Sequence, residues 1–345
     1  MIRKFFLIVI CLVAAAAVWH FSVIPSSDPI VKVESPTVAP AKTLSIGWVG
    51  DMVPSSDIGY NLTVLNNVTD ALEQPDFMMG NLEGTFAHYG RKSKCMYISS
   101  MCHAFQGEPS FADTLKAAGF DFVSLINNHS YDYGDAGLKD TEAELDRVGI
   151  AYIAPDKSTT SMTIKGVRVG IMGLSSTEPT ETINDYAYIA STVAALKKDN
   201  DIVVVIFHGG SEGATKTAVT GTTEYMGTEN RGNVQAVAHT AINAGADLVL
   251  GDGPHVLRKT ETFNGKPIAY SLGNFVGGKG RLATPAGNLS LGGIYTTIFS
   301  NAADTSSTRF APTNTAFTSI VLSKDGIPSL DPTDQAKILL DSLSK

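Results

Sequence analysis

The chain has 345 residues, enough for one large hydrophobic core or two modest ones. It is 43% hydrophobic and 17% charged, which is the composition of a globular protein rather than a disordered or collagen-like one. The net charge is −8 and no block of basic residues occurs, so nucleic acid is not an expected partner, because neutralising phosphates requires clustered Lys and Arg.

The N-terminus predicts a membrane segment. Arg3 and Lys4 precede an apolar run over residues 5–19, which continues less purely to Ile24. Its length lies between that of a signal-peptide core and a spanning helix of ~20 residues. We favour an uncleaved anchor over residues 1–24, with cleavage in the run Ala14–Ala17 as the alternative. The expected location is the cell membrane, single-pass, with the main domain extracytoplasmic.

An extended tether and an α/β domain are expected to follow. Residues 25–43 are rich in Pro, Ser and Val and show no helical period, which is typical of a linker. From residue 44 to about residue 274, strand-like and helical patterns alternate, which indicates a mainly parallel sheet covered on both faces. Helices are expected at residues 66–73, 111–118, 137–148, 193–198 and 233–244.

Hairpins are expected after residue 255. Asn264-Gly265 lies between two strand-like runs, 256–263 and 267–271, and is a strong type I′ turn signal. Further strands are expected at 293–300 and 315–322, a short helix at 335–343, and loops at 212–231 and 301–314. We assign residues 44–300 to one domain, completed by a C-terminal strand and short helix within residues 301–345.

Cys95 and Cys102 are expected to form a disulfide. They lie seven positions apart in a loop-like stretch, and the predicted compartment is oxidising. Two free thiols are the main alternative. Metal binding is less favoured, because no C-x-x-C pair or third nearby cysteine supports it.

Five hydrophobic, strand-like runs each end in polar residues. Because strand ends in an open α/β sheet converge on one edge, these polar residues are expected to meet there. Carboxylates, amide oxygens and imidazoles together are metal-ligand types, so the pattern predicts a metal site. The clusters contain Asp51, then Asn81 and Glu83, then Asn127, Asn128 and His129, then His208 and Glu212, and finally Asp252 and His255.

Each of these residues also has a plainer interpretation. Asp51 could simply form a turn after Gly50, and Glu83 could be a solvated loop acid. His129 and His208 could be core histidines with satisfied hydrogen bonds. Asp132 could orient His129 as a carboxylate behind the ring.

Two blocks of the sequence resemble those of a known family. The blocks Asn-His-x-x-Asp-x-Gly at residues 128–134 and Tyr-Ser-Leu-Gly-Asn-Phe at residues 270–275 are similar to those of the bacterial capsule-synthesis family that includes the CapA and PgsA poly-γ-glutamate proteins. That family in turn resembles the calcineurin-like metallophosphoesterases in fold. Further matches are Gly50-Asp51, residues 80–84, His208 with Gly210 and Glu212, and residues 254–256; together they span about residues 44–276.

The resemblance implies an α/β fold, a four-layer α/β sandwich of the metallophosphoesterase type, with a metal cleft. It implies divalent ions, one or two, of Mn, Mg, Fe or Zn. The implied metal ligands are Asp51 and His255 for one ion, Glu83 as a bridge, and Asn128 and His208 for the second. The implied catalytic pair is His129 and Asp132, and the implied substrate contacts are Asn81, Glu212 and Asn274.

The chain departs from the pattern at four positions. Asp252 and Gly253 stand where the family usually has histidines, Gly209 where it usually has Trp, and Val53 where phosphoesterases carry a motif histidine. More oxygen and fewer nitrogen ligands favour Mn²⁺ or Mg²⁺ over Zn²⁺, or a weakened single-metal site. Asp252 is then a candidate replacement ligand.

Three functions are consistent with the sequence. The first is a membrane-tethered capsule or poly-γ-glutamate biosynthesis protein, with a metal-dependent hydrolase-type site that acts on an amide or phosphate ester. Its expected partners are synthase subunits and an extracellular anionic polymer. The alternatives are a cell-surface metal-dependent phosphoesterase and a non-catalytic binding or export subunit. Arg91, Lys92 and Lys94 could offset the negative charge toward such a polymer, although such a group is more often a solvated loop.

Overall fold

Two β-sheets form the centre of the protein in a computed structural model. The structure describes residues 41–54, 63–97, 102–177, 182–277, 286–301 and 309–345. The predicted anchor at 1–24 and nearly all of the predicted tether lie outside these residues. Within the described parts, no helix is long and apolar enough to cross a membrane.

The first sheet has the strand order β16-β15-β14-β1-β2-β3-β4, with β13 paired to the end of β1. Strands β1 to β4 run parallel, whereas β14, β15 and β16 add antiparallel strands on the other side of β1. The strands are β1 (Thr43–Met52), β2 (Phe77–Leu82), β3 (Phe122–Ser124), β4 (Ala151–Ile153), β13 (Asn274–Val276), β14 (Leu291–Asn301), β15 (Phe310–Leu322) and β16 (Pro328–Leu330).

The second sheet has the order β11-β12-β10-β7-β6-β5. Its four central strands are parallel, and β5 and β11 close its two edges in antiparallel fashion. The strands are β5 (Thr159–Ile164), β6 (Val167–Ser175), β7 (Ile202–His208), β10 (Leu248–Asp252), β11 (Thr260–Phe263) and β12 (Lys266–Ala269). The expectation of one mainly parallel sheet is therefore corrected to two mixed sheets.

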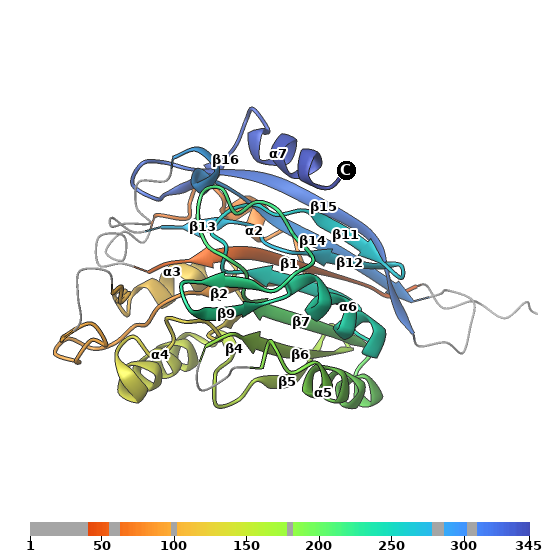
Figure 1. Ribbon diagram of the computed structural model, residues 1–345, viewed down its shortest axis with the longest axis horizontal. Helices are drawn as coiled ribbons and strands as arrows, with labels where there is room; N and C mark the ends of the chain where they lie inside the picture. Colours follow the sequence, from red (N-terminus) through yellow and green to blue (C-terminus); the bar gives the residue numbers. More distant parts are fainter. Residues whose placement is uncertain (1–40, 55–62, 98–101, 178–181, 278–285, 302–308) are drawn as a thin grey trace, which may run out of the picture. The chain divides into compact units, whose positions relative to one another are not determined.

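The sheets pack against each other, and helices cover their outer faces. The sequence of β7 is continuously apolar because both faces of the strand are buried. Val204 and Ile206 face the core between the sheets, whereas Val203 and Val205 face the helices. Helices α2, α3 and α4 cover the first sheet, α5 and α6 cover the second, and α7 packs on β14 and β15 (Figure 1). The helices are α2 (Thr69–Leu72), α3 (Phe111–Ala117), α4 (Gly134–Val148), α5 (Tyr186–Asp199), α6 (Val234–Ala244) and α7 (Gln335–Leu343).

Several element boundaries differ from the expectations. Helix α5 begins at Tyr186 rather than near residue 193, because the Asp185 side chain caps it by accepting a hydrogen bond from the Tyr188 N–H. The stretch 212–231, expected to be a loop, contains the hairpin of β8 (Glu224–Met226) and β9 (Glu229–Gly232). Residues 310–314, also expected in a loop, belong to β15, where pairing with β14 overrides their polar composition.

The hairpin at Asn264-Gly265 is confirmed. Both residues have positive φ, 50° and 73°, as a type I′ turn requires, and they join β11 to β12. The strand before the turn is shorter than expected, since β11 begins only at Thr260.

Replacement of Ile171 by Ala tests the core between the sheets. Ile171 lies in β6 and is fully buried between the two sheets. We expect Ile171→Ala to lower the free energy of unfolding by about 3 kcal/mol, because it leaves a cavity. Urea denaturation measures this. The matched variant Ile338→Ala, at a 64% exposed position of α7, should change it by less than about 0.5 kcal/mol; equal losses in the two variants would contradict the packing described.

Candidate metal centre

The polar residues predicted from the strand ends meet at one edge of the two sheets. Strands β1, β2 and β3 are parallel, as are β7 and β10, so their carboxyl ends point to common edges. The side chains of Asp51, Glu83 and His208 are completely buried, and those of Asp252 and His255 almost so. Residues far apart in the sequence thus form one buried cluster.

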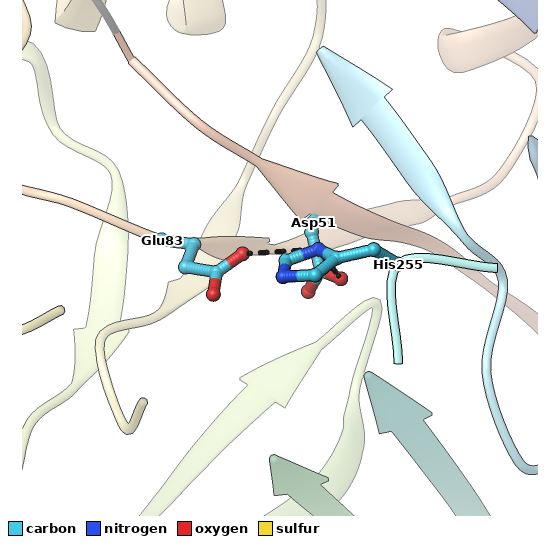
Figure 2. Close-up of side chains that lie close together, drawn as sticks. All are labelled: Asp51, Glu83 and His255. Carbon is cyan, nitrogen blue, oxygen red and sulfur yellow. Dashed lines mark ion pairs between the residues drawn. The ribbon is translucent and has the colours of Figure 1, made fainter. Parts of the chain in front are cut away.

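Asp51, Glu83 and His255 form the first group that could hold a metal ion. The His255 Nδ1 lies 3.0 Å from Asp51 Oδ2 and 3.7 Å from Glu83 Oε2. Figure 2 shows the three side chains converging from three separate segments. His255 follows Gly253-Pro254 and has φ 61°, a conformation that is uncommon for a residue other than glycine and is enriched at active sites.

Asn274 holds His255 in place. Its Oδ1 lies 3.0 Å from His255 Nδ1, and its Nδ2 donates to the backbone carbonyls of His255 and Leu289. The amide is therefore bonded within the protein and positions His255, and its predicted contact with substrate stays a prediction.

Asp51, His208 and Asp252 form the second group. His208 Nδ1 lies 2.5 Å from Asp252 Oδ1, and Asn81 Nδ2 donates to Asp51 Oδ1 at 2.9 Å. Asp51 belongs to both groups. The geometry places Asp252 as a partner of the His208 ring, an arrangement that fixes the orientation of a histidine beside a metal.

Asn81 and Asn127 connect the segments of the centre by side-chain hydrogen bonds. Asn127 Nδ2 donates to Asn81 Oδ1 and to the Leu82 carbonyl, both at 2.9 Å, and Asn127 Oδ1 accepts from the His129 N–H. Asn81 is completely buried and bonded within the site, and its predicted contact with substrate stays a prediction. Asn128, predicted to bind the second ion, directs its backbone carbonyl to Lys94 Nζ at 3.0 Å.

His129 and Asp132 are paired as the sequence predicted. Their Nδ1 and Oδ2 atoms are 2.8 Å apart, and Asp132 is also 2.6 Å from Lys94 Nζ and accepts from the Phe105 N–H. The Phe105 ring lies against the His129 ring, with the centroids 4.1 Å apart. Burial lowers the pKa of His129 despite the nearby Asp132, which favours the neutral ring near pH 7.

Arg231 is a member of the centre that the sequence did not reveal. It lies in β9, inside the stretch expected to be a loop, and is completely buried. Its Nη2 lies 2.9 Å from Glu212 Oε1 and 3.3 Å from His208 Nε2. That stretch is rich in Thr, Gly and Asn and has no strand-like pattern, so the sequence did not indicate a buried role for Arg231. Glu212, predicted to contact substrate, is 18% exposed and pairs with Arg231.

Several buried side-chain oxygens of the centre lack a hydrogen-bond partner. Among the described residues, both carboxylate oxygens of Glu83, the Oδ2 of Asp252 and the Oδ1 of Asn128 are buried without a hydrogen bond. Burial raises the pKa of Glu83 and of Asp252 well above their ordinary values, and the charge of Asp51 adds to this. A divalent cation would supply the missing partner, and an oxygen-rich set with imidazole suits Mn²⁺ or Mg²⁺. The residues therefore fit a metal ion.

Two of the three basic residues near the disulfide form ion pairs within the protein. Cys95 and Cys102 are joined by a disulfide. Lys94 pairs with Asp132, and Arg91 makes two hydrogen bonds of 2.8 Å to the Asp140 carboxylate. Both side chains remain partly exposed, and a contribution of residues 91–94 to binding of an acidic polymer stays a prediction.

The sequence matches the family described as bacterial capsule synthesis protein PGA_cap over residues 45–279, a range that contains every residue of the centre. The chain belongs to this family. It is 28% identical over 285 residues to the capsule biosynthesis protein CapA of Bacillus anthracis, covering 69% of this chain and 62% of the relative. It is 28% identical over 274 residues to the PGA biosynthesis protein CapA of Bacillus subtilis (strain 168), covering 71% and 67%. The chain thus spans about two thirds of the length of these family members, and slightly less for the Bacillus anthracis protein.

Solved structures show a weaker likeness. A hypothetical protein from Thermus thermophilus matches with a TM-score of 0.48 and 14% identity, over 80% of this chain and 98% of that one. A novel phosphatase from Mycoplasma pneumoniae matches with the same score and identity, over 82% and 95%. At this level the likeness supports no conclusion about the activity of this chain.

The pKa of His255 predicts a pH-dependent stability of the metal-free protein. Burial favours the neutral ring, but the charges of Glu83, Asp51 and Glu212 outweigh it and raise the pKa from 6.5 to about 10. The folded state thus keeps a proton that the unfolded state releases above pH 6.5, so the stabilisation present below pH 6.5 is lost towards pH 10. The raised pKa values of Glu83 and Asp252 act in the same direction.

We expect the free energy of unfolding of metal-free protein to fall by a few kcal/mol from about pH 7 to about pH 9, as urea denaturation would show. Saturating Mg²⁺ should flatten the profile, because a bound ion replaces the proton. The His239→Gln variant, which lacks a histidine outside the centre, should behave like the wild type. Constant stability of the metal-free protein over this range would contradict the assigned charge on His255.

The double variant Cys95→Ser/Cys102→Ser tests the disulfide. The bond closes a short loop of sequence separation 7, so its loss should cost about 2 kcal/mol of unfolding free energy. Reduced wild-type protein should match the double variant in thermal or urea denaturation. If both are as stable as the oxidised protein, the disulfide has no such role.

Proposed function

We propose that this family member is a membrane-tethered, extracytoplasmic protein of capsule or poly-γ-glutamate biosynthesis with a metal-dependent hydrolase-type site. Membership of the capsule synthesis family and the name of the Bacillus anthracis relative support the process, and the name of the Bacillus subtilis relative, a PGA biosynthesis protein, supports poly-γ-glutamate as the polymer. Synthase subunits and the extracellular anionic polymer are the proposed partners. The predicted N-terminal segment would hold the domain at the outer surface of the cell membrane.

One observation carries the hydrolase proposal: Glu83, a completely buried carboxylate to which no described residue donates a hydrogen bond, faces Asp51 and His255. Leaving a carboxylate in this state costs several kcal/mol unless a cation or proton accompanies it. A metal-dependent site accounts for the position of Glu83, whereas a purely structural core does not need it.

The residues of the chain suggest how such a site would act. A bound divalent ion polarises a carbonyl or phosphoryl oxygen and makes water a better nucleophile. His129 has a lowered pKa and is held by Asp132, so the neutral ring can accept a proton from the reacting group. The proposed reaction is hydrolysis or transfer at an amide or phosphate ester of the polymer.

The burial of the centre favours one alternative, a non-catalytic binding or export subunit. Asp51, Glu83 and His208 have no exposed surface in the structure. A polymer could reach them only after surrounding segments move. In this alternative the ion would stabilise the fold and the polymer would bind elsewhere on the protein.

Turnover by the full chain separates these functions. We expect protein purified in mild detergent and loaded with Mn²⁺ to shorten poly-γ-glutamate, measured by gel filtration and by release of new amino groups. Glu83→Gln should reduce the rate on the order of 100-fold or more, because it removes a charged ligand. His239→Gln, on the far helix α6 and paired with Glu261, should leave the rate unchanged.

Other outcomes would redirect the assignment. Cleavage of bis(p-nitrophenyl) phosphate without cleavage of the polymer would identify a cell-surface phosphoesterase. Polymer binding without turnover in the metal-loaded protein would identify a binding or export subunit. Either result would overturn the proposed hydrolysis of the polymer.

A further inference from the structure

The guanidinium of Arg231 is fixed beside the metal centre from several sides. Its Nε donates to the Gly210 carbonyl at 3.1 Å, and its Nη1 lies 3.3 Å from Glu229 Oε1. The backbone carbonyl of Arg231 in turn accepts from the Gly210 N–H at 2.8 Å. Because the side chain is also completely buried, it has little freedom to move away.

The remaining nitrogen of the guanidinium points into the centre. Nη2 carries two N–H groups, and it lies 2.9 Å from Glu212 Oε1 and 3.3 Å from His208 Nε2. The other ring nitrogen of His208, Nδ1, is 2.5 Å from Asp252 Oδ1. A neutral His208 that donates from Nδ1 to Asp252 therefore accepts from Arg231 at Nε2.

This contact occupies the Nε2 lone pair of His208, the ring nitrogen that is free to bind a metal while Nδ1 donates to Asp252. An ion at Nδ1 would instead move the ring proton to Nε2, where it would face the N–H of Arg231. A histidine binds a metal through an unprotonated ring nitrogen about 2.1 Å from the ion. An arginine does not lose its proton in proteins, so its N–H and a metal cannot share His208 Nε2. An ion at that nitrogen would also meet a fixed positive charge a few ångströms away.

In the second group, Asp252 Oδ2 has no hydrogen-bond partner, whereas both oxygens of Asp51, which the two groups share, have contacts within the protein. Asn81 Nδ2 donates to Asp51 Oδ1, and the Gly253 N–H lies 3.3 Å from Asp51 Oδ2. Gly253 has φ 108°, and a Cβ at this position would lie 3.1 Å from Arg231 Nη2. The absence of a side chain at residue 253 thus leaves the space that the guanidinium fills.

The first group is different. Neither oxygen of Glu83 accepts a hydrogen bond from a described residue. The nearest imidazole nitrogens, His255 Nδ1 and His208 Nε2, each lie 3.7 Å from one of these oxygens, and no guanidinium or ammonium group is paired with Glu83 among the described residues. Among the described residues, the second group therefore has a permanently charged side chain beside it, that of Arg231, whereas the first group has none paired with its free carboxylate.

We propose that the centre binds one divalent ion, at Asp51, Glu83 and His255, and that the guanidinium of Arg231 stands in the place of a second ion. This inference rests on the proposed metal-dependent function. Arg231 would then supply a fixed positive charge and N–H donors toward an anionic oxygen of the substrate, which a guanidinium does without being loaded from solution.

The number of bound ions tests this inference. The full chain is stripped with a chelator and titrated with Mn²⁺, with binding followed by calorimetry and by elemental analysis after dialysis. We expect one equivalent in the wild type and the electron paramagnetic resonance spectrum of isolated Mn²⁺. Arg231→Gln removes the charge and should admit a second equivalent, with a spectrum of two magnetically coupled ions. Arg231→Lys keeps the charge and should remain at one equivalent.

The results are distinguishable. Two equivalents in the wild type, or a single equivalent in a folded Arg231→Gln variant, would overturn the role of Arg231. No Mn²⁺ binding by the wild type would instead overturn the metal-dependent function itself. If circular dichroism shows that Arg231→Gln does not fold, the wild-type stoichiometry and spectrum still decide, because two coupled ions in the wild type contradict the inference and one isolated ion supports it.

Discussion

The stability of the fold depends on offsetting the negative charge of three buried carboxylates. Asp51 in β1, Glu83 directly after β2 and Asp252 at the end of β10 lie in one desolvated cluster, where like charges repel strongly. Positive charge from His255 on one side and Arg231 on the other offsets this repulsion in the metal-free protein. The fold tolerates such a cluster only because these cations, or an ion that replaces the proton of His255, are present.

The two-sheet architecture is what brings these groups together. Parallel strands within each sheet direct their carboxyl ends to one edge, and packing of the sheets face to face brings the two edges into contact. The side chains of Asp51, His208 and Asp252 lie within the last residues of strands, and Glu83 directly follows one. Glycines at the turns, such as Gly253, leave room for neighbouring side chains to fill the site.

Much of the centre could be predicted from the sequence because its ligands follow strongly apolar strands. Asp51, Glu83, His208 and His255 were all expected at the strand ends, and the structure brings them together. Arg231 could not be predicted, because it comes from a polar hairpin whose pairing depends on tertiary contacts.

The arrangement of the two sheets and the contacts of the asparagines could not be predicted from the sequence, for related reasons. A continuously apolar strand such as β7 shows that both faces are buried but does not tell which face meets a helix and which a second sheet. Asn81 and Asn274 have the same residue type as substrate contacts, and only their geometry shows that they bind neighbours within the protein.

The central claim is that a divalent ion belongs among Asp51, Glu83 and His255. Anomalous diffraction from crystals of the full chain grown with Mn²⁺, recorded on both sides of the manganese absorption edge, tests it most directly. We predict one strong anomalous peak between these three side chains. A metal-soaked crystal with no peak there, or with a peak bound only elsewhere on the protein, would contradict this account.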